Sequence, residues 1–301
     1  MTIEASSWLA AAAEAAARQQ YPAAALYVVA TPIGNLADIT VRALHVLSLV
    51  DAVACEDTRH TAQLLRHYGL GDKALVAVHE HNEREAAPQL VQRLARGQRV
   101  AYVSDAGTPA VSDPGARLVQ AVREAGHRVV PVPGPSSAAA AVSVAGDDAG
   151  QGFRFVGFLP PRPRELEQAV AALCQDHSTL VLFEAPHRID ALARLLATHL
   201  PARRVTVCRE LTKQFEEVVT LTAQALPDWL AADPHRHKGE FVLVLHAHAE
   251  TAEDPLARAE PALRALVAAL PLKQAVALAA QLTGAPRNAL YERALQIKQG
   301  E

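Results

Sequence analysis

Short apolar runs alternate with helix-like stretches in the first half of the chain, and no other sequence feature constrains the fold as strongly. Between Leu26 and Ala145, five runs have the length and composition of buried strands. They are LYVVA (26–30), DAVAC (51–55), ALVAV (74–78), RVAYV (99–103) and RVVPV (128–132). Strands separated by helices predict an α/β fold, with a mostly parallel sheet and helices on both faces.

The stretches between these strands have helical periodicity and plausible first or last residues. Asp38 is predicted to cap a helix whose apolar side carries Ile39, Ala43, Val46 and Leu47. The other predicted helices are Thr58–Tyr68, Glu83–Ala95, Gly115–Glu124 and Pro135–Val144. Gly69, Gly97 and Gly126 follow three of them, as expected where helices end.

The second half predicts another α/β segment, separated from the first by the Gly- and Asp-containing linker Gly146–Gly152. Helices are expected from Arg164 and from His187. The predicted strands are FRFVGF (153–158), STLVLF (178–183), RRVTVC (203–208), FEEVVTLT (215–222) and FVLVLH (241–246). FEEVVTLT has the pattern of a hairpin partner, so this second sheet is expected to be mixed.

We therefore expect an extension over 1–25, an N-terminal α/β domain over 26–146, a C-terminal α/β domain over 152–247 and a small helical tail over 254–298. In the tail, residues 272–296 predict two helices around TGAP. Their spacing resembles a helix-turn-helix, but a plain helical hairpin or a dimer-packing element would have the same pattern.

Composition and charge narrow the class of protein. The net charge of −3 does not favour a general nucleic-acid binder, so any RNA contact must come from local patches. Cys55, Cys174 and Cys208 lack zinc-ligand spacing and are expected to be buried thiols in a reducing cytosol. The Ala-rich start carries charged residues where a signal peptide needs an unbroken apolar run. No segment approaches the roughly 18 uncharged residues of a membrane span, so we expect a cytoplasmic protein.

Polar loops follow several of the predicted strands, at the sheet edge where α/β proteins bind ligands. They are TPIGNLADIT (31–40), SDAGTPAVSDPG (104–115), PGPSSA (133–138), EAPHRI (184–189) and RELTKQFE (209–216), and HRHKGE (235–240) precedes the last strand. Gly34, Gly107, Gly115 and Gly134 would permit close backbone approach. Each loop alone would pass for a tight turn, but together they predict a small-molecule site.

Motifs of other nucleotide enzymes are absent from the sequence. There is no GxGxxG after the first strand, which disfavours a nicotinamide enzyme or an ordinary Rossmann methyltransferase. There is no GxxxxGK[ST] for a nucleoside triphosphatase, and Ser136 and Ser137 do not lie in a GxSxG elbow.

The motifs together resemble the tetrapyrrole methylase superfamily. TPIGNLADIT, CEDTR, HEHNE, SDAGTPAVSDPG, PGPSS, GFLPPRP, FEAPHRI, RELTKQFE and KGEFVL look like its branch that 2′-O-methylates a cytidine in the decoding region of 16S ribosomal RNA. The match runs in unbroken order over roughly 26–246. The sequence departs from the pattern in its N-terminal extension and at Arg162, where relatives typically have a lysine nearby; an arginine there keeps the charge.

The resemblance implies a two-domain fold with S-adenosylmethionine in the cleft between the domains, and a homodimer. It also implies which residues contact the cofactor. They are Pro32, Gly34 and Asn35 in the first loop, Gly107, Thr108, Pro109 and Val111 in the second, Ser136 and Ser137 in the third, and Glu184, Ala185, Leu211, Gly239 and Glu240 in the second domain.

Methyl transfer to a ribose hydroxyl mainly needs in-line placement, and a base can remove the hydroxyl proton. Candidate catalytic residues in the polar loops are Glu56, Asp57, His79, Glu80, Asp105, Glu210 and Lys213. A structural alternative is open for Asp57, which would also suit a helix cap. No metal is expected, since the HxH of residues 79–81 lacks a third ligand.

Basic and polar side chains in or near the motif loops are the candidate RNA contacts, against the alternative that each is a solvated surface residue. They are Arg59, His81, Asn82, Arg162, Arg188 and Lys238. The expected partner is 16S RNA or the small ribosomal subunit. Two other functions are considered: methylation of a tetrapyrrole or corrin precursor on the same fold, and non-catalytic RNA binding by an assembly factor.

Overall fold

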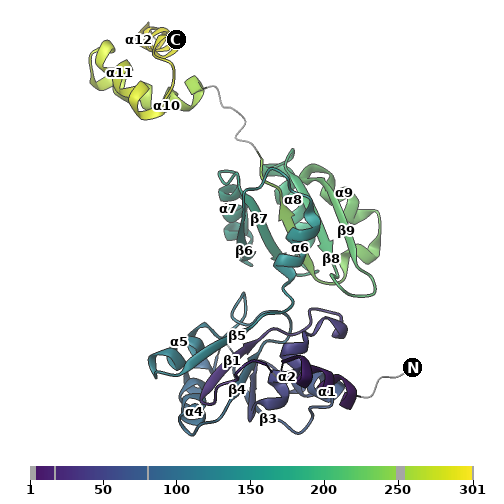
Figure 1. The fold of residues 1–301 in the computed structure, drawn as a ribbon. Helices are drawn as coiled ribbons and strands as arrows, with labels where there is room; N and C mark the ends of the chain where they lie inside the picture. Colours follow the sequence, from purple (N-terminus) through teal and green to yellow (C-terminus); the bar gives the residue numbers. More distant parts are fainter. Residues whose placement is uncertain (1–4, 17, 80, 249–254, 300–301) are drawn as a thin grey trace. The chain divides into compact units, whose positions relative to one another are not determined.

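The structure is a computed structural model, and it describes residues 5–16, 18–79, 81–248 and 255–299. The chain divides into two compact units, residues 1–246 and residues 247–301 (Figure 1). The first unit contains two five-stranded sheets, and the second consists of helices.

The first sheet is entirely parallel, as the alternating pattern predicted, and its strand order is β3-β2-β4-β1-β5. Its strands are β1 (Ala25–Val29), β2 (Ala52–Cys55), β3 (Ala74–Ala77), β4 (Val100–Val103) and β5 (Arg128–Val132). The helices are α1 (Ala5–Ala16), α2 (Val41–Leu49), α3 (Thr58–His67), α4 (Glu83–Ala95), α5 (Ala116–Glu124) and α6 (Ser137–Ala145).

Helices cover both faces of the first sheet, which confirms the predicted layers. Side chains of a strand alternate between the two faces. Val53 and Cys55 therefore pack in one core cluster with α1, α2 and α3, whereas Ala54 packs in another with α4 and α5. The N-terminal extension contributes α1 to the first cluster, where Ala12 is buried.

The start of α2 differs from the prediction, because Thr40 and not Asp38 caps this helix. The Thr40 hydroxyl accepts a hydrogen bond from the Ala43 amide at 3.1 Å. Asp38 instead ends a short 3₁₀ turn, η1 (Leu36–Asp38), and Ile39 is extended. The prediction therefore started the helix too early. The side-chain oxygen of Asn35 accepts a hydrogen bond from the Ala37 amide, and this bond helps to fold Leu36–Asp38 into a separate turn before α2.

The second sheet is mixed, as the hairpin pattern predicted, and its order is β6-β7-β10-β8-β9. Its strands are β6 (Phe153–Phe158), β7 (Thr179–Glu184), β8 (Arg204–Arg209), β9 (Glu217–Thr222) and β10 (Phe241–Leu245). Only β6 and β7 pair in parallel; β10 lies antiparallel between β7 and β8, and β9 is the antiparallel partner of β8.

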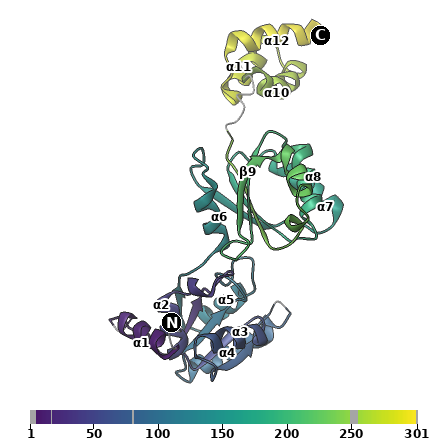
Figure 2. The same cartoon turned by 90° about the vertical axis from the view of Figure 1, so that its right-hand side faces the viewer.

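Helices also cover both faces of the second sheet, on one side α7 (Pro163–Leu173), α8 (Ile189–His199) and α9 (Leu226–Ala231). The short elements η2 (Ala223–Ala225) and η3 (Pro234–His237) flank α9. The other face packs against α6, whose Ala138, Ala141 and Ala145 belong to one core cluster with Val181 and Val244 of the sheet. Figure 2 shows α6 on one side of this sheet and α7 and α8 on the other. The sequence pattern did not predict α9.

The second unit is formed by α10 (Pro255–Ala269), α11 (Leu272–Thr283) and α12 (Arg287–Gln299). It has its own apolar core, which includes Leu263, Val276 and Leu290. Gly284 ends α11 in the left-handed conformation at φ 71°, so TGAP forms the predicted turn between two helices. Among the described residues, no helix is both long enough and apolar enough to cross a membrane.

Candidate active site

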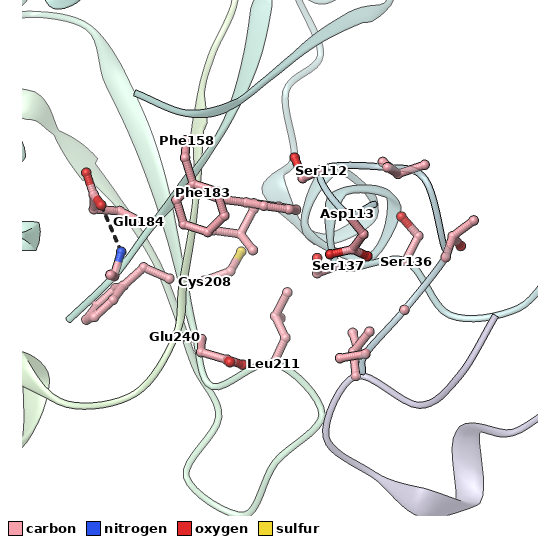
Figure 3. A pocket seen from close by; sticks show the side chains of 18 of the residues that line it. Ser112, Asp113, Ser136, Ser137, Phe158, Phe183, Glu184, Cys208, Leu211 and Glu240 are labelled. Carbon is pink, nitrogen blue, oxygen red and sulfur yellow. Dashed lines mark hydrogen bonds between the residues drawn. The ribbon is translucent and has the colours of Figure 1, made fainter. Parts of the chain in front are cut away.

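A pocket with a volume of about 370 Å³ lies in the first unit, at the edge where strands of both sheets end. This is within the range of small-molecule sites. Its lining residues come mostly from the polar loops (Figure 3), and they are Ile33, Ala106, Gly107, Thr108, Val111, Ser112, Asp113, Ser136, Ser137, Phe158, Phe183, Glu184, Ala185, Pro186, Cys208, Leu211, Glu240, Phe241 and Val242.

The antiparallel strand β10 explains why residues so far apart in the chain share this pocket. Because β10 runs opposite to β7 and β8, its first residues lie beside the last residues of those strands. Phe241 thus pairs with Glu184 on one side and with Arg209 on the other. The loops that follow β7 and β8 and the loop that precedes β10 therefore meet at one edge.

The loop after β4, residues 104–115, is held in an unusual conformation where it lines the pocket. Ala110 and Ser112 both have positive φ, at 64° and 63°, which non-glycine residues rarely adopt. Backbone hydrogen bonds of 2.9 and 3.0 Å join Gly107 to Thr31, and the Thr108 hydroxyl donates to the Pro135 carbonyl at 3.0 Å. The loops after β1, β4 and β5 are thereby tied together.

The far end of the same loop is fixed by two buried groups beneath it. The Tyr102 hydroxyl donates to the Pro114 carbonyl at 2.6 Å. The Glu83 carboxylate, which is buried, accepts hydrogen bonds from the amides of Gly115 at 3.1 Å and Leu118 at 2.8 Å. Glu83, the last residue of HEHNE, thus caps the first turn of α5 from a distant part of the chain. Gly115 is required here, since its φ is 127° and an added Cβ would lie 2.3 Å from the Tyr102 ring.

A buried carboxylate, Glu184, forms part of the wall contributed by the second sheet. Its Oε1 accepts the Ala185 amide at 2.8 Å and pairs with Arg188 Nε at 3.3 Å. The other oxygen, Oε2, is buried and has no hydrogen-bond partner among the described residues. Burial raises the pKa of Glu184, although the Ala185 amide and Arg188 oppose the shift. A buried acceptor without a donor is costly, so Oε2 is suited to accept a hydrogen bond from a bound molecule.

A second carboxylate of the wall, Glu240, is held by a lysine. Lys213 Nζ lies 2.8 Å from both Glu240 Oε2 and Glu210 Oε1. The Glu240 amide also donates to Glu210 Oε1 at 2.9 Å. Burial acts to raise the pKa of Glu210, but these hydrogen bonds lower it more. Glu210 has a positive φ of 53°, so this loop is also held in a rare conformation.

Nine of the fourteen predicted cofactor residues line the pocket, namely Gly107, Thr108, Val111, Ser136, Ser137, Glu184, Ala185, Leu211 and Glu240. The other five, Pro32, Gly34, Asn35, Pro109 and Gly239, are not among the lining residues. Gly34 packs closely against Lys213 and Thr212, and Gly239 against Glu210. The side chain of Asn35 accepts the Ala37 amide. These glycines and Asn35 therefore shape or join the loops, and Ile33 is the residue of the first loop that contacts the pocket.

Six of the seven candidate catalytic residues are not among the lining residues, namely Glu56, Asp57, His79, Asp105, Glu210 and Lys213. The seventh, Glu80, lies outside the described residues. Asp57 caps α3, where its carboxylate accepts the amides of Arg59 at 2.7 Å and His60 at 3.3 Å. These hydrogen bonds lower the pKa of Asp57. Asp105 in turn accepts the Asp57 amide at 3.2 Å.

The predicted RNA contacts fall into two groups. Arg59, His81, Arg162 and Lys238 are exposed, with Arg162 in a surface ion pair with Glu165. Arg188 and Asn82 are partly buried and bonded within the protein: Arg188 donates to the carbonyls of Leu159 and Pro160 at 2.8 and 3.0 Å. Asn82 Oδ1 accepts the His79 amide at 2.8 Å. Across the described part of the chain, no cluster of three or more His, Cys, Asp or Glu side chains suits a metal ion.

Several lining residues were not predicted, and most of them are apolar. Phe158, Phe183, Cys208, Phe241 and Val242 belong to strand ends that the sequence indicated only as buried core. Phe158 nevertheless remains 56% exposed, with its ring edge-on to Phe183 at a centroid distance of 5.6 Å. The sequence signal that could have indicated this wall is the position of Phe158 and Phe183 in the motifs GFLP and FEAPHRI, at or next to the last residue of a strand.

Asp113 also lines the pocket, and its carboxyl group was not among the predicted site residues. It lies inside SDAGTPAVSDPG, the motif that supplied four of the predicted cofactor residues. Burial raises the pKa of its carboxyl group to about 6; a hydrogen bond from Ser104 opposes this shift, and the nearby charges of Glu56 and Asp105 add to it. In Figure 3 its carboxylate points into the pocket, beside Ser137.

Known families match both units of the chain. The family described as Tetrapyrrole (Corrin/Porphyrin) Methylases matches residues 25–227, and the one described as RsmI C-terminal HTH domain matches residues 253–298. The second description agrees with the helix-turn-helix interpretation of the tail.

Close relatives cover nearly the whole chain. The chain is 49% identical, over 91% of its length and 94% of the relative's, to ribosomal RNA small subunit methyltransferase I of Neisseria meningitidis serogroup B. It is 47% identical, over 90% of its length and 94% of the relative's, to the protein of the same name in Escherichia coli O157:H7.

Solved structures show the same fold at low identity. The uroporphyrin-III-C-methyltransferase of Thermus thermophilus is 23% identical, with a TM-score of 0.54 over 74% of this chain and 94% of that one. A cobalt precorrin-4 methyltransferase is 20% identical, with a TM-score of 0.56 over 73% of this chain and 94% of that one. The family match over two thirds of the sequence, the relatives and the shared fold agree, and this chain belongs to the tetrapyrrole (corrin/porphyrin) methylase family.

Proposed function

We propose that the protein transfers a methyl group from S-adenosylmethionine to the 2′-hydroxyl of a cytidine in the decoding region of 16S ribosomal RNA. The relatives that share 47–49% of its residues over nine tenths of its length are named as small-subunit ribosomal RNA methyltransferases. The observation that carries the proposal is that the motif loops of both sheets line one pocket. One pocket can therefore hold the donor at the predicted cofactor residues, and the named relatives support ribosomal RNA as the substrate.

The pocket has the chemistry that an adenosine-containing donor requires. The unpartnered, buried Oε2 of Glu184 offers an acceptor for a hydroxyl or amino group. Phe158 and Phe183 offer apolar surface for a ring. Gly107 and Thr108 bring backbone and hydroxyl groups to the opposite wall. We propose the fourteen predicted cofactor residues as the cofactor site. Nine of them line the pocket, and the other five would hold the loops of the pocket in place.

The rate of methyl transfer should depend more on how the protein places the methyl group against the ribose hydroxyl than on the strength of an acid or base in the site. When bound, the donor supplies a methyl group activated by a positively charged sulfur. The protein orients this group, and its apolar wall of Phe158, Phe183, Phe241 and Val242 keeps water from the reacting atoms. Glu56, Asp57, His79, Glu80, Asp105, Glu210 and Lys213 remain the residues proposed to support catalysis from around the pocket.

The RNA is proposed to contact the exposed residues Arg59, His81, Arg162 and Lys238, with Asn82 and Arg188 supporting the loops beneath. We further propose that the protein is cytoplasmic and forms a homodimer. We propose that each chain has domains at the predicted boundaries, 26–146, 152–247 and 254–298. A locally basic rim is compatible with the net charge of −3, because only the contacted surface must attract phosphate.

The test is to map ribose methylation of 16S RNA from cells with and without the protein, through the resistance of the 2′-O-methylated linkage to alkaline hydrolysis. One cytidine in the decoding region should lose its mark in the absence of the protein and regain it when the protein is restored. A variant that fills the pocket, Val111→Trp, should not restore it. A mark that persists without the protein contradicts the proposal; methylation of a corrin precursor by the purified protein would support the alternative.

A further inference from the structure

Three carboxyl groups line the pocket, and their surroundings differ. Glu184 pairs with Arg188, and Glu240 pairs with Lys213. Asp113 has no such partner: within the described parts of the chain, no Lys, Arg or His forms an ion pair with it. A carboxylate that is already neutralised by a cation is a poor proton acceptor, so Asp113 is the lining carboxyl group best suited to accept a proton.

The groups around Asp113 raise the affinity of its carboxylate for a proton. Glu56 in the loop after β2 and Asp105 in the loop after β4 are acidic, and the Ser104 hydroxyl and the Tyr102 phenol are neutral. Burial and these two acids raise the pKa of Asp113 to about 6, while the hydrogen bond from Ser104 lowers it. A general base works best when its pKa lies close to the working pH.

The backbone around Asp113 is fixed rather than free to adjust. Ser112, immediately before it, is held at a φ of 63°, and Pro114 after it accepts the hydrogen bond of Tyr102. Glu83 fixes the next residue, Gly115, through its amide. A side chain on such a segment keeps one direction, and Figure 3 shows it pointing into the pocket.

From this geometry we infer that Asp113 is the general base of the methyl transfer and takes the proton from the ribose hydroxyl. This inference rests on the proposed function. The hydroxyl oxygen forms a bond to the methyl carbon, the bond from that carbon to sulfur breaks, and its electron pair stays on sulfur as a neutral thioether. The hydroxyl proton moves to a carboxylate oxygen of Asp113.

The charge changes in this reaction suit an acid of raised pKa. Before transfer, the positive sulfur of the donor stabilises the Asp113 carboxylate, so the base is present in its charged form. After transfer that positive charge is gone, and Glu56 and Asp105 favour retention of the proton on Asp113. The same carboxyl group is therefore ready to accept the proton when the donor is bound and holds it when the product is formed.

The experiment compares wild type with Asp113→Asn, and uses Asp72→Asn as the control. Asp72 is exposed in the loop before β3, away from the lining residues, and its replacement removes the same charge. Single-turnover methylation of small ribosomal subunits that lack the ribose methyl group is measured from pH 5 to 8, with labelled donor in excess. Binding of S-adenosylhomocysteine is measured separately by calorimetry.

We expect Asp113→Asn to slow methyl transfer by about 100-fold or more, the usual contribution of a general base, with S-adenosylhomocysteine affinity within about twofold of wild type. The wild-type rate should rise with pH to a plateau because the carboxylate is the active form. This inflection should be absent in Asp113→Asn and present in Asp72→Asn. Asp113→Glu, which keeps a carboxylate, should recover part of the rate.

Two results would overturn the inference. One is a fast Asp113→Asn variant with an unchanged pH profile. The other is a variant that has lost S-adenosylhomocysteine binding, which would make Asp113 a ligand of the donor or a support of the pocket instead of the base. Failure of the proposed function is distinguishable from both, because then wild type itself would not methylate the subunits.

Discussion

At the scale of single residues, acidic side chains in and around the pocket have different roles, which depend on their burial and on their hydrogen-bond partners. Asp57 is exposed and accepts two amides, so it acts as a helix cap with a lowered pKa. Glu83 is buried and caps α5 from outside the helix. Glu184 is buried with one oxygen satisfied and the other unpartnered. The same type of functional group is thus structural in the first two places and available to a ligand in the third.

The unpartnered oxygen of Glu184 leads to a prediction about cofactor affinity. In Glu184→Gln one oxygen becomes an amide nitrogen and the charge that balances Arg188 disappears. We expect S-adenosylhomocysteine to bind about tenfold more weakly, equivalent to about 1.4 kcal/mol. Calorimetry on this variant and on Glu167→Gln, an exposed residue of α7, provides the measurement and its control. Equal affinity for wild type and Glu184→Gln would show that Oε2 does not face the cofactor.

At the scale of elements, the two sheets are joined at the pocket by contacts between their loops. The loop after β1 approaches the loop after β8 so closely that residue 34 has no room for a side chain. Lys213 on the second loop cannot easily move away, because it is held by Glu210 and Glu240. Gly34 is therefore required for the contact between these loops, and not for a backbone conformation that only glycine adopts.

This contact predicts the effect of Gly34→Ala. The new Cβ would lie 2.5 Å from Lys213 Cγ and 2.9 Å from Thr212 Oγ1, so one of the loops must shift. We expect a loss of about 1–3 kcal/mol in the free energy of unfolding, the usual range for overpacking, and weaker S-adenosylhomocysteine binding. Urea unfolding and calorimetry measure the two effects. Gly152→Ala is the matched control, since its added Cβ has no atom of the described residues within 4 Å beyond the glycine itself and its chain neighbours. If both variants behave alike, the contact between the loops is unimportant.

At the scale of the whole molecule, the pocket belongs entirely to the first unit. Its lining residues fall between Ile33 and Val242, whereas the second unit has a separate core in α10, α11 and α12. Units with separate cores can keep their own structure when one is removed. The family described as RsmI C-terminal HTH domain matches residues 253–298, none of which is among the lining residues of the pocket.

Removal of the second unit should therefore leave cofactor binding intact. For a protein that ends at His246, we expect the dissociation constant of S-adenosylhomocysteine to stay within about twofold of the full chain, which calorimetry would detect easily. The rate of RNA methylation by the shortened protein then reports the contribution of the tail. A large loss of S-adenosylhomocysteine affinity would mean that the tail supports the pocket.

The sequence by itself determined the elements and their layers, because apolar periodicity and turn residues act over short distances along the chain. The parallel first sheet, the hairpin of β8 and β9 and the polar loops at the strand ends all followed from such local patterns. Local patterns missed the short helix α9 and misplaced the start of α2, where Asp38 and Thr40 both suited the cap position.

Only the tertiary structure decided which side chains face the pocket. The position of β10 between β7 and β8 brings Glu240 and Phe241 beside Glu184, and no local pattern contains that pairing. The same holds for Asp113, whose direction depends on Glu83 and Tyr102 in other elements. Lining a pocket is a property of residues that are distant in sequence and close in space, so the loops were predictable, whereas the choice of residues within them required the packed chain.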